Sequence, residues 1–402
     1  MESSNRNPRS SAGALSSLGE RASAPEYQRS ESIGVQTDSD HTQEDVRHTD
    51  LWFSDGSVIL KAENTLFRVH ISQLSRHSAF FRDLFSLPQP PHCNRTRSLS
   101  DSSSTTVLDG THLEGCPVVY LHDTAEDVGN LLAALYDGPN FGSNDQDDFR
   151  MVSGILRLST KYLCDSLRAK ALAHLSIAWP SDLKSWDARE DAARYEGDSE
   201  NPTNTGHVYP TPIAVINLAR EIDASSLLPS AFYDLSRYTY AQIFEASDQS
   251  ASGFSPPSPF LSLADMQKLA LGKEASQQAI TCLIQSMGNS QCHQSAPQHH
   301  SPSRTISSAA HIRKSCASVA ECRKDFSELV DLATQHYLFD RERGCGDPLY
   351  VAEELGQLKS AELCVSECKP CARSLEAWAA KERGKIWKLI PTWFRLEAAP
   401  LT

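Results

Sequence analysis

The sequence has no apolar run that approaches the roughly 18 residues of a membrane-spanning helix. Its N-terminal residues, MESSNRNPRSSAGALSSLGERAS, lack the apolar core of a secretion signal. Glycine is scarce, at 19 of 402 residues, and neither G-x-x-x-x-G-K-[ST] nor a glycine-rich dinucleotide turn occurs. G-x-S-x-G and H-E-x-x-H are also absent. These absences predict a soluble, intracellular protein, cytoplasmic or nuclear, and they argue against the common classes of enzyme.

Basic residues are also fewer than acidic ones. The chain has 38 Lys and Arg against 51 Asp and Glu, which gives a formal net charge of -13. This balance argues against nucleic acid or anionic lipid as a general partner, and it does not exclude a local basic patch. The eleven cysteines are an odd number without a disulfide-framework spacing, so we expect reduced thiols.

The stretch from Asp50 to Phe85 is the most informative part of the chain. It contains two short apolar runs around Glu63 and Asn64, and Asn tolerates the positive φ that a two-residue hairpin turn requires. A turn at these two residues places facing pairs on one apolar side of the hairpin, and those pairs are Leu60 with Phe67 and Val58 with Val69. The sequence therefore predicts a hairpin with one buried face.

An amphipathic helix is predicted directly after His70. Ser72 is a plausible N-cap for it. The residues that recur at helical spacing are Ile71, Leu74, Ser78, Phe81 and Phe85. We expect this helix to pack on the apolar face of the hairpin.

A second strand and helix follow a Pro- and Ser-rich segment. Val118 to Leu121 is typical of a short strand, and Thr124 with Asp127 fits a capping box at a helix start. That helix is closed by Gly138 and Pro139. Two more helices are predicted, one from Phe149 to Leu163 and one after a cap at Asp165.

Together these segments resemble a BTB/POZ domain of the fungal, basidiomycete-type kind. The resemblance is carried by D-G-S-V-I-L, L-F-R-V-H, L-S-R-H-S-A-F-F-R-D-L-F, V-V-Y-L-H-D-T-A-E-D and L-L-A-A-L-Y-D-G, which occur in the order of the family. It covers about Thr49 to Trp179 and weakens towards the C-terminus. It implies an α/β fold of short strands with flanking helices, and protein binding without catalysis. The residues expected to maintain this domain or its interactions are Asp50, Phe67, Val69, His70, Leu74, Phe81 and Phe85.

The organisation expected for the whole chain is a tail, a BTB/POZ domain and an all-α C-terminal region. The predicted boundaries are a disordered tail at 1–48, the domain at 49–179 with a flexible loop at 87–116, a linker at 180–210, and a helical region at 211–402 with flexible loops at 247–259 and 288–308. Within the helical region, helices are expected at 212–224, 227–244, 263–287, 316–339 and 349–368.

The expected activity is that of a scaffold or adaptor, acting through self-association as a homo-oligomer or through a partner protein. Three alternatives remain open from the sequence: a substrate adaptor of a cullin-type ubiquitin ligase, a transcriptional regulator, and an enzyme or zinc protein built on the C-terminal cysteines. A transcriptional regulator needs a DNA-binding element, and the sequence has no C2H2 pattern.

Two sets of residues suggest chemistry, and each has a structural alternative. Cys364, Cys368 and Cys371 have C-x3-C-x2-C spacing and could hold a structural zinc, with a fourth ligand from Cys345, Cys322 or His336. The same spacing also suits buried core thiols. His70 and Asp50 could form an acid–base pair, but without a nucleophile we favour polar residues that line a corner of the domain.

A basic amphipathic helix is predicted near the C-terminus. Its apolar stripe runs from Leu375 to Ile390 and is interleaved with lysines and an arginine. Such a helix binds a membrane surface, an acidic partner or nucleic acid in some proteins, whereas in most it packs on its own domain. We favour packing on the protein itself.

Overall fold

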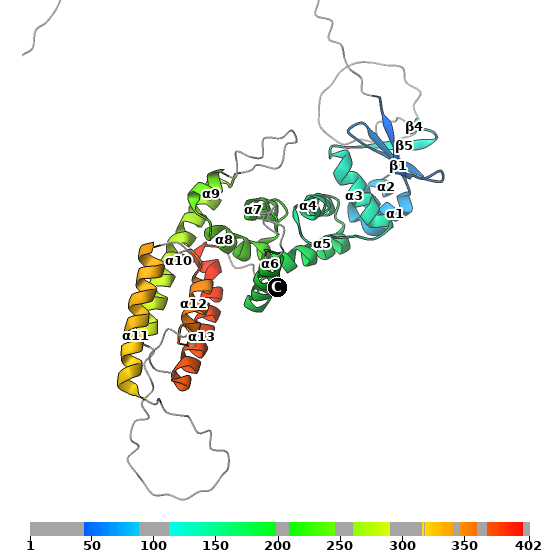
Figure 1. Ribbon diagram of the computed structural model, residues 1–402. Helices are drawn as coiled ribbons and strands as arrows, with labels where there is room; N and C mark the ends of the chain where they lie inside the picture. Colours follow the sequence, from blue (N-terminus) through cyan, green and yellow to red (C-terminus); the bar gives the residue numbers. More distant parts are fainter. Residues whose placement is uncertain are drawn as a thin grey trace, which may run out of the picture. The chain divides into compact units, whose positions relative to one another are not determined.

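The computed structural model describes residues 44–87, 112–197, 209–245, 260–289, 316, 318–340, 346–359 and 368–396. Two units are distinguished, Met1–Glu44 and Asp45–Thr402, and all described residues except Glu44 belong to the second. The described part is mostly helical, with one small mixed sheet (Figure 1). Residues 1–43, 88–111, 247–259 and 290–308 of the predicted flexible segments lie outside the described residues. The loop predicted at 288–308 is wrong at its first two residues, which end a helix at Leu263–Asn289.

The sheet has five strands in the order β1-β3-β2-β5-β4. Their bounds are β1 Val46–Trp52, β2 Val58–Ala62, β3 Thr65–Val69, β4 His112–Leu113 and β5 Cys116–Leu121. The β2–β3 and β4–β5 pairs are antiparallel, whereas β1 joins β3 and β5 joins β2 in parallel. Because β1 begins at Val46, the predicted tail boundary at residue 48 is wrong by a few residues, and β4 begins inside the predicted loop 87–116.

The predicted hairpin register is confirmed. The pairs Val58 with Val69 and Leu60 with Phe67 face each other, but the residue of the turn with a positive φ is Glu63, at 51°, and not Asn64 as expected. These four side chains are buried in the main core. The opposite face of the sheet has a smaller buried cluster, Ile59, Leu66, Cys116 and Val118, against which Trp52 packs.

Two short helices replace the one predicted after His70. They are α1 Ile71–His77 and α2 Ala79–Ser86, separated at Ser78. The Ser78 hydroxyl accepts from the backbone N–H of Phe81 at 3.0 Å, and it donates to the Tyr162 carbonyl at 2.5 Å. Ser78 is therefore the N-cap of a new helix, and Ser72 caps nothing because it lies inside α1.

The next three helices are α3 Ala125–Tyr136, α4 Gln146–Lys161 and α5 Asp165–Ala178. The predicted cap of α3 is confirmed, since Thr124 Oγ1 accepts from the N–H of Asp127 at 3.2 Å. Gly138 follows the helix with a φ of 87°, a conformation that favours glycine. Asp165 is the first residue of α5 and not its cap, because Cys164 occupies the cap position.

The segment 180–210 is not simply a linker, because α6 occupies Leu183–Gly197. Trp186 of this helix is buried in the main core, and the guanidinium of Arg189 lies over the rings of Trp179, Trp186 and Tyr209 at 4.6–4.8 Å. A buried cation on aromatic faces holds α6 in place, although the helix is polar in composition. Residues 198–208 lie outside the described part of the chain.

Helices account for the regular structure described after α6. They are α7 Pro212–Glu221, a 3-10 turn Ser225–Leu227, α8 Leu228–Ser236, α9 Tyr240–Glu245, α10 Leu263–Asn289, α11 Val319–Thr334, a π-helix Gln335–Asp340, α12 Pro348–Gln357 and α13 Lys369–Trp393. The helix predicted at 227–244 is divided into α8 and α9, and the helix predicted at 349–368 ends at residue 357. In α13 the predicted apolar stripe is buried at Leu375, Ala379, Ile386 and Ile390. The interpretation that this helix packs on the protein itself is therefore confirmed.

A buried ion-pair network joins α6, α8 and the start of α12. Asp234 of α8 accepts from Arg189 at 2.8 Å and also pairs with Arg237. Arg237 reaches Glu190 at 2.7 Å and Asp347 at 3.2 Å. The carboxylates compensate the two guanidiniums, which would otherwise be costly to bury.

Within the described ranges, the helices include none with the length and the apolar character needed to cross a membrane.

Candidate functional site

A groove of about 630 Å³ lies between β1 and α3. Concave sites of this size suit a small molecule or several side chains of a bound peptide. Its floor is apolar and its rim is polar. The lining residues are His48, Asp50, Leu51, Phe53, Ala125, Glu126, Gly129, Asn130, Ala133, Tyr136 and Asp137.

The groove depends on an irregular stretch in β1. The register with β3 shifts between Arg47 and Trp52, and His48 lies within this shift. His48 Nδ1 accepts from the backbone N–H groups of Asp50 and Leu51, each at 3.2 Å. Its ring also stacks on Phe67 with centroids 5.1 Å apart. Irregularities at a sheet edge redirect side chains, and this one directs His48 and Asp50 to the groove.

Charge on the groove is acidic. Asp50, Glu126 and Asp137 contribute carboxylates, and no lysine or arginine occurs among the residues described as lining it. Glu126 pairs with Arg150 of α4 at 2.5 Å. All three carboxylates are exposed, and the ion pairs described for them involve Glu126 and not Asp50 or Asp137.

His70 connects the hairpin corner to the end of α3 beside this groove. The Tyr136 hydroxyl accepts from the His70 backbone N–H at 2.9 Å and lies 2.8 Å from Nδ1 of the same residue. The donor and acceptor in this second contact depend on the tautomer of the imidazole, and the hydroxyl donates to Nδ1 when the ring proton is on Nε2. Nε2 lies 3.3 Å from Oδ1 of Asp55, and Phe53 stacks on Tyr136 at 4.8 Å.

The electrostatics of this corner favour a structural role. Partial burial raises the pKa of Tyr136. Backbone hydrogen bonding, followed by the hydrogen bond to His70, lowers the pKa of the exposed Asp55. A tyrosine with a raised pKa is a poor nucleophile, and the groove lining contains no serine, threonine or cysteine. His70 contacts Asp55 and Tyr136, and the described contacts include no hydrogen bond between His70 and Asp50.

Replacing Tyr136 by phenylalanine tests this corner. We expect the free energy of unfolding to fall by about 1–3 kcal/mol, because the His70 backbone N–H and Nδ1 lose their shared partner. Urea unfolding of the full chain measures the loss. Tyr120→Phe is the matched control, since Tyr120 is exposed on β5. Equal stability of the two variants would contradict a role for the hydroxyl in fixing the corner.

The other residues expected to maintain the domain lie in or near the core. Phe67, Val69, Leu74 and Phe81 are buried, and Phe85 is partly buried and packs against the same core. Phe81 stacks between Phe85 and Tyr162 at 6.0 and 4.9 Å. Asp50 is the one exposed member of the predicted set, and it lines the groove.

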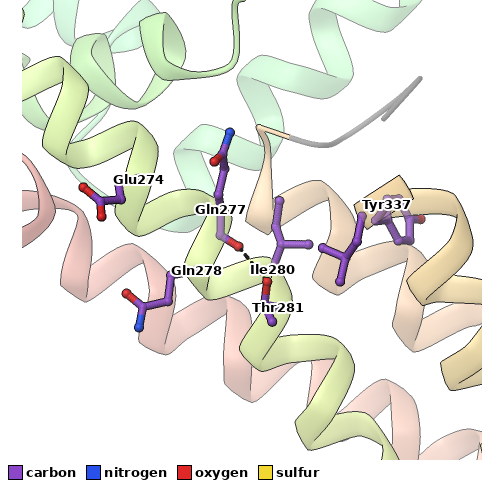
Figure 2. Close-up of a pocket in the computed structure, with 7 residues that line it drawn as sticks. Glu274, Gln277, Gln278, Ile280, Thr281 and Tyr337 are labelled. Carbon is purple, nitrogen blue, oxygen red and sulfur yellow. Dashed lines mark hydrogen bonds between the residues drawn. The ribbon is translucent and has the colours of Figure 1, made fainter. Parts of the chain in front are cut away.

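Two further cavities are weaker candidates for a binding or catalytic site. Figure 2 shows one of about 410 Å³ that is lined by Glu274, Gln277, Gln278, Ile280, Thr281, Tyr337 and Leu338, with Thr281 donating to the Gln277 carbonyl. The Thr281 hydroxyl is bonded to a backbone carbonyl, and the hydrogen bonds described for this cavity include none between Thr281 and Glu274. The other, of about 370 Å³, is lined by Asp187, Arg237, Glu353, Arg383 and neighbouring residues, and its charges belong to ion pairs within the protein.

The predicted cysteine set is only partly brought together. Cys368 and Cys371 lie beside Cys322, one of the three suggested fourth ligands, and beside Cys316, which is not among the predicted ligands. His336 is exposed on the π-helix. Cys364 and Cys345 lie outside the described residues. The spacing of Cys316 from Cys322 was the available signal, but Cys316 is 52 residues from Cys368 in the chain.

Comparisons with protein-family models, curated proteins and solved structures found no match to this chain. The function is therefore inferred from the residues and from their geometry.

Proposed function

We propose that this chain is a non-catalytic protein-interaction scaffold of the BTB/POZ kind. We also propose that its groove between β1 and α3 binds a basic segment of a partner protein. The order of elements supports the family assignment, because the β2–β3 hairpin, the α1–α2 pair, β5, α3 and the α4–α5 pair follow one another as the resemblance implies. An interaction role also agrees with the absence of a nucleophile from the groove.

The acidic charge of the groove is the observation that indicates a basic partner. Leu51, Phe53 and Ala133 supply apolar floor, whereas Asp50 and Asp137 place two exposed carboxylates on its rim. Complementary charge directs encounter and register at interfaces, and apolar contact supplies affinity. A peptide with one apolar anchor between lysine or arginine side chains fits this combination.

A second copy of the chain is the competing occupant. Each copy has a formal net charge of -13, and the groove itself is acidic. Like charges at an interface are repulsive, so the groove favours a basic heterologous partner over self-association. The sequence alone leaves both self-association and a partner protein open, and the charge of the groove favours the partner protein.

Selection from a displayed library of random short peptides tests the proposal on the full chain. We expect enriched peptides to contain lysine or arginine beside an aromatic or aliphatic residue. The double substitution Asp50→Lys with Asp137→Lys should weaken their binding at least tenfold, which corresponds to about 1.4 kcal/mol. The matched control reverses two exposed acids elsewhere, Asp83→Lys with Asp331→Lys, and should retain the affinity.

Two results would contradict the proposal. One is enrichment of peptides without basic residues. The other is equal binding by the groove variant and its control. Light scattering on the full chain tests whether a second copy occupies the groove. A concentration-dependent dimer that the double substitution Asp50→Lys with Asp137→Lys abolishes would assign the groove to a second copy.

A further inference from the structure

Two helix starts bring four cysteines together outside the groove. Cys316 precedes α11 and Cys322 is the fourth residue of that helix, whereas Cys368 directly precedes α13 and Cys371 is its third residue. Their four sulfur atoms all lie within 4.8 Å of one another. The segments that carry the two pairs are far apart in the sequence.

The sulfur positions match a tetrahedral metal site. A zinc ion bound to four thiolates at about 2.3 Å places its ligands about 3.8 Å apart along the edges of a tetrahedron. The Sγ atoms of Cys316 and Cys322 are 3.4 Å apart, and those of Cys368 and Cys316 are 3.7 Å apart. Both separations are far longer than the roughly 2.05 Å of a disulfide bond.

The surroundings of the cluster favour thiolates and a closed site. Cys322, Cys368 and Cys371 are buried, and Cys316 is half-buried. The positive ends of two helix dipoles meet at the cluster, and such ends stabilise nearby negative charge. Four sulfur ligands leave no open coordination position, which is the pattern of a structural zinc and not of a catalytic one.

We propose that Cys316, Cys322, Cys368 and Cys371 bind one Zn²⁺, which fastens the start of α11 to the start of α13. This assignment replaces Cys364 of the C-x3-C-x2-C run with two cysteines from the other helix start. It is independent of the groove, so either proposal can fail without the other. Fe²⁺ also accepts four thiolates. Zinc is proposed because four cysteines are a typical ligand set of structural zinc sites.

Elemental mass spectrometry of the purified full chain tests the site. The expected result is one zinc per chain, with iron absent. Cys316→Ser and Cys371→Ser should each lower the zinc content at least fivefold. The matched controls Cys282→Ser, which changes an exposed cysteine of α10, and Cys364→Ser should both retain zinc.

A second measurement does not depend on the variants folding. Removal of zinc from the wild-type chain by a chelator should lower the thermal midpoint of unfolding by several degrees, and added Zn²⁺ should restore it. Cobalt in place of zinc should give the thiolate charge-transfer band of a tetrahedral sulfur site. A folded wild-type chain without metal, a chain that contains iron instead, or a mass that reveals a disulfide within this set would overturn the proposal. Loss of zinc from Cys364→Ser with retention in Cys316→Ser would overturn the ligand assignment.

Discussion

Replacing Phe67 by alanine is expected to lower the free energy of unfolding by about 3–5 kcal/mol. Phe67 is 0% exposed and lies opposite Leu60 in the hairpin. Its ring stacks with His48, and a Cβ on Gly129 would be 3.7 Å from it. The phenyl ring therefore packs against β1 at His48 and against α3 near Gly129. Its removal leaves a cavity that these two elements cannot easily fill.

Denaturant unfolding of the full chain, followed by circular dichroism, measures the Phe67→Ala effect. The control is Phe339→Ala, because Phe339 is 71% exposed on the π-helix. The control should change stability by less than about 1 kcal/mol. A Phe67→Ala variant as stable as the control would show that the hairpin core does not hold the groove in place.

Replacing Asp234 by asparagine is the second change with a large expected effect. Breaking a buried ion pair from one side costs about 3–5 kcal/mol, because the partner charge stays buried. Here Asp234 contacts both Arg189 and Arg237, and it is the most deeply buried carboxylate among their partners, which also include Glu190 and Asp347. The same unfolding measurement applies, with Asp331→Asn at an exposed position of α11 as its control. Equal stability of the two variants would contradict the role of the network.

The network also predicts a pH dependence. Burial by itself would raise the pKa of Asp234, but the nearby charges of Arg237 and Arg189 outweigh it and hold that pKa below its ordinary value. A depressed folded-state pKa gives stability that is present above the unfolded-state pKa of about 3.9 and is lost as the pH falls through the folded value. Wild-type stability should therefore decline in acid more steeply than that of the Asp234→Asn variant. Parallel pH profiles would contradict this account.

Local signals in the sequence are sufficient to predict the β2–β3 hairpin and the start of α3. The pairing of Leu60 with Phe67 follows from turn chemistry and the two-residue period of a strand, and the cap at Thr124 follows from hydrogen-bonding capacity. Both features involve residues close together in the chain. The break at Ser78 was missed because its hydroxyl is fixed by the Tyr162 carbonyl, 84 residues away.

Distant partners also explain why α6 was missed. Its sequence is polar, and burial of Arg189 is possible only because Asp234 and three aromatic rings surround the guanidinium. Those partners lie in other elements, so hydropathy read along the helix gave no signal. The division between a domain at 49–179 and a helical region at 211–402 stays a prediction.

The candidate site was only partly accessible to sequence reasoning. The family resemblance predicts roles for Asp50 and His70, whereas the predicted tail includes His48 and no pattern in the sequence points to Asp55. The groove requires β1 to lie beside α3, and no local pattern predicts that contact. The cysteine cluster has the same limitation, since its two halves come from separate helix starts.

Hydrogen exchange of the full chain, with and without a peptide from the selection, tests whether the groove between β1 and α3 is the interaction site. We expect slower exchange in Val46–Trp52 and Ala125–Tyr136 when the peptide is bound, and no change in the Asp50→Lys with Asp137→Lys variant. Protection confined to α10, α11, α12 or α13, with β1 and α3 unchanged, would contradict an interaction site in the groove.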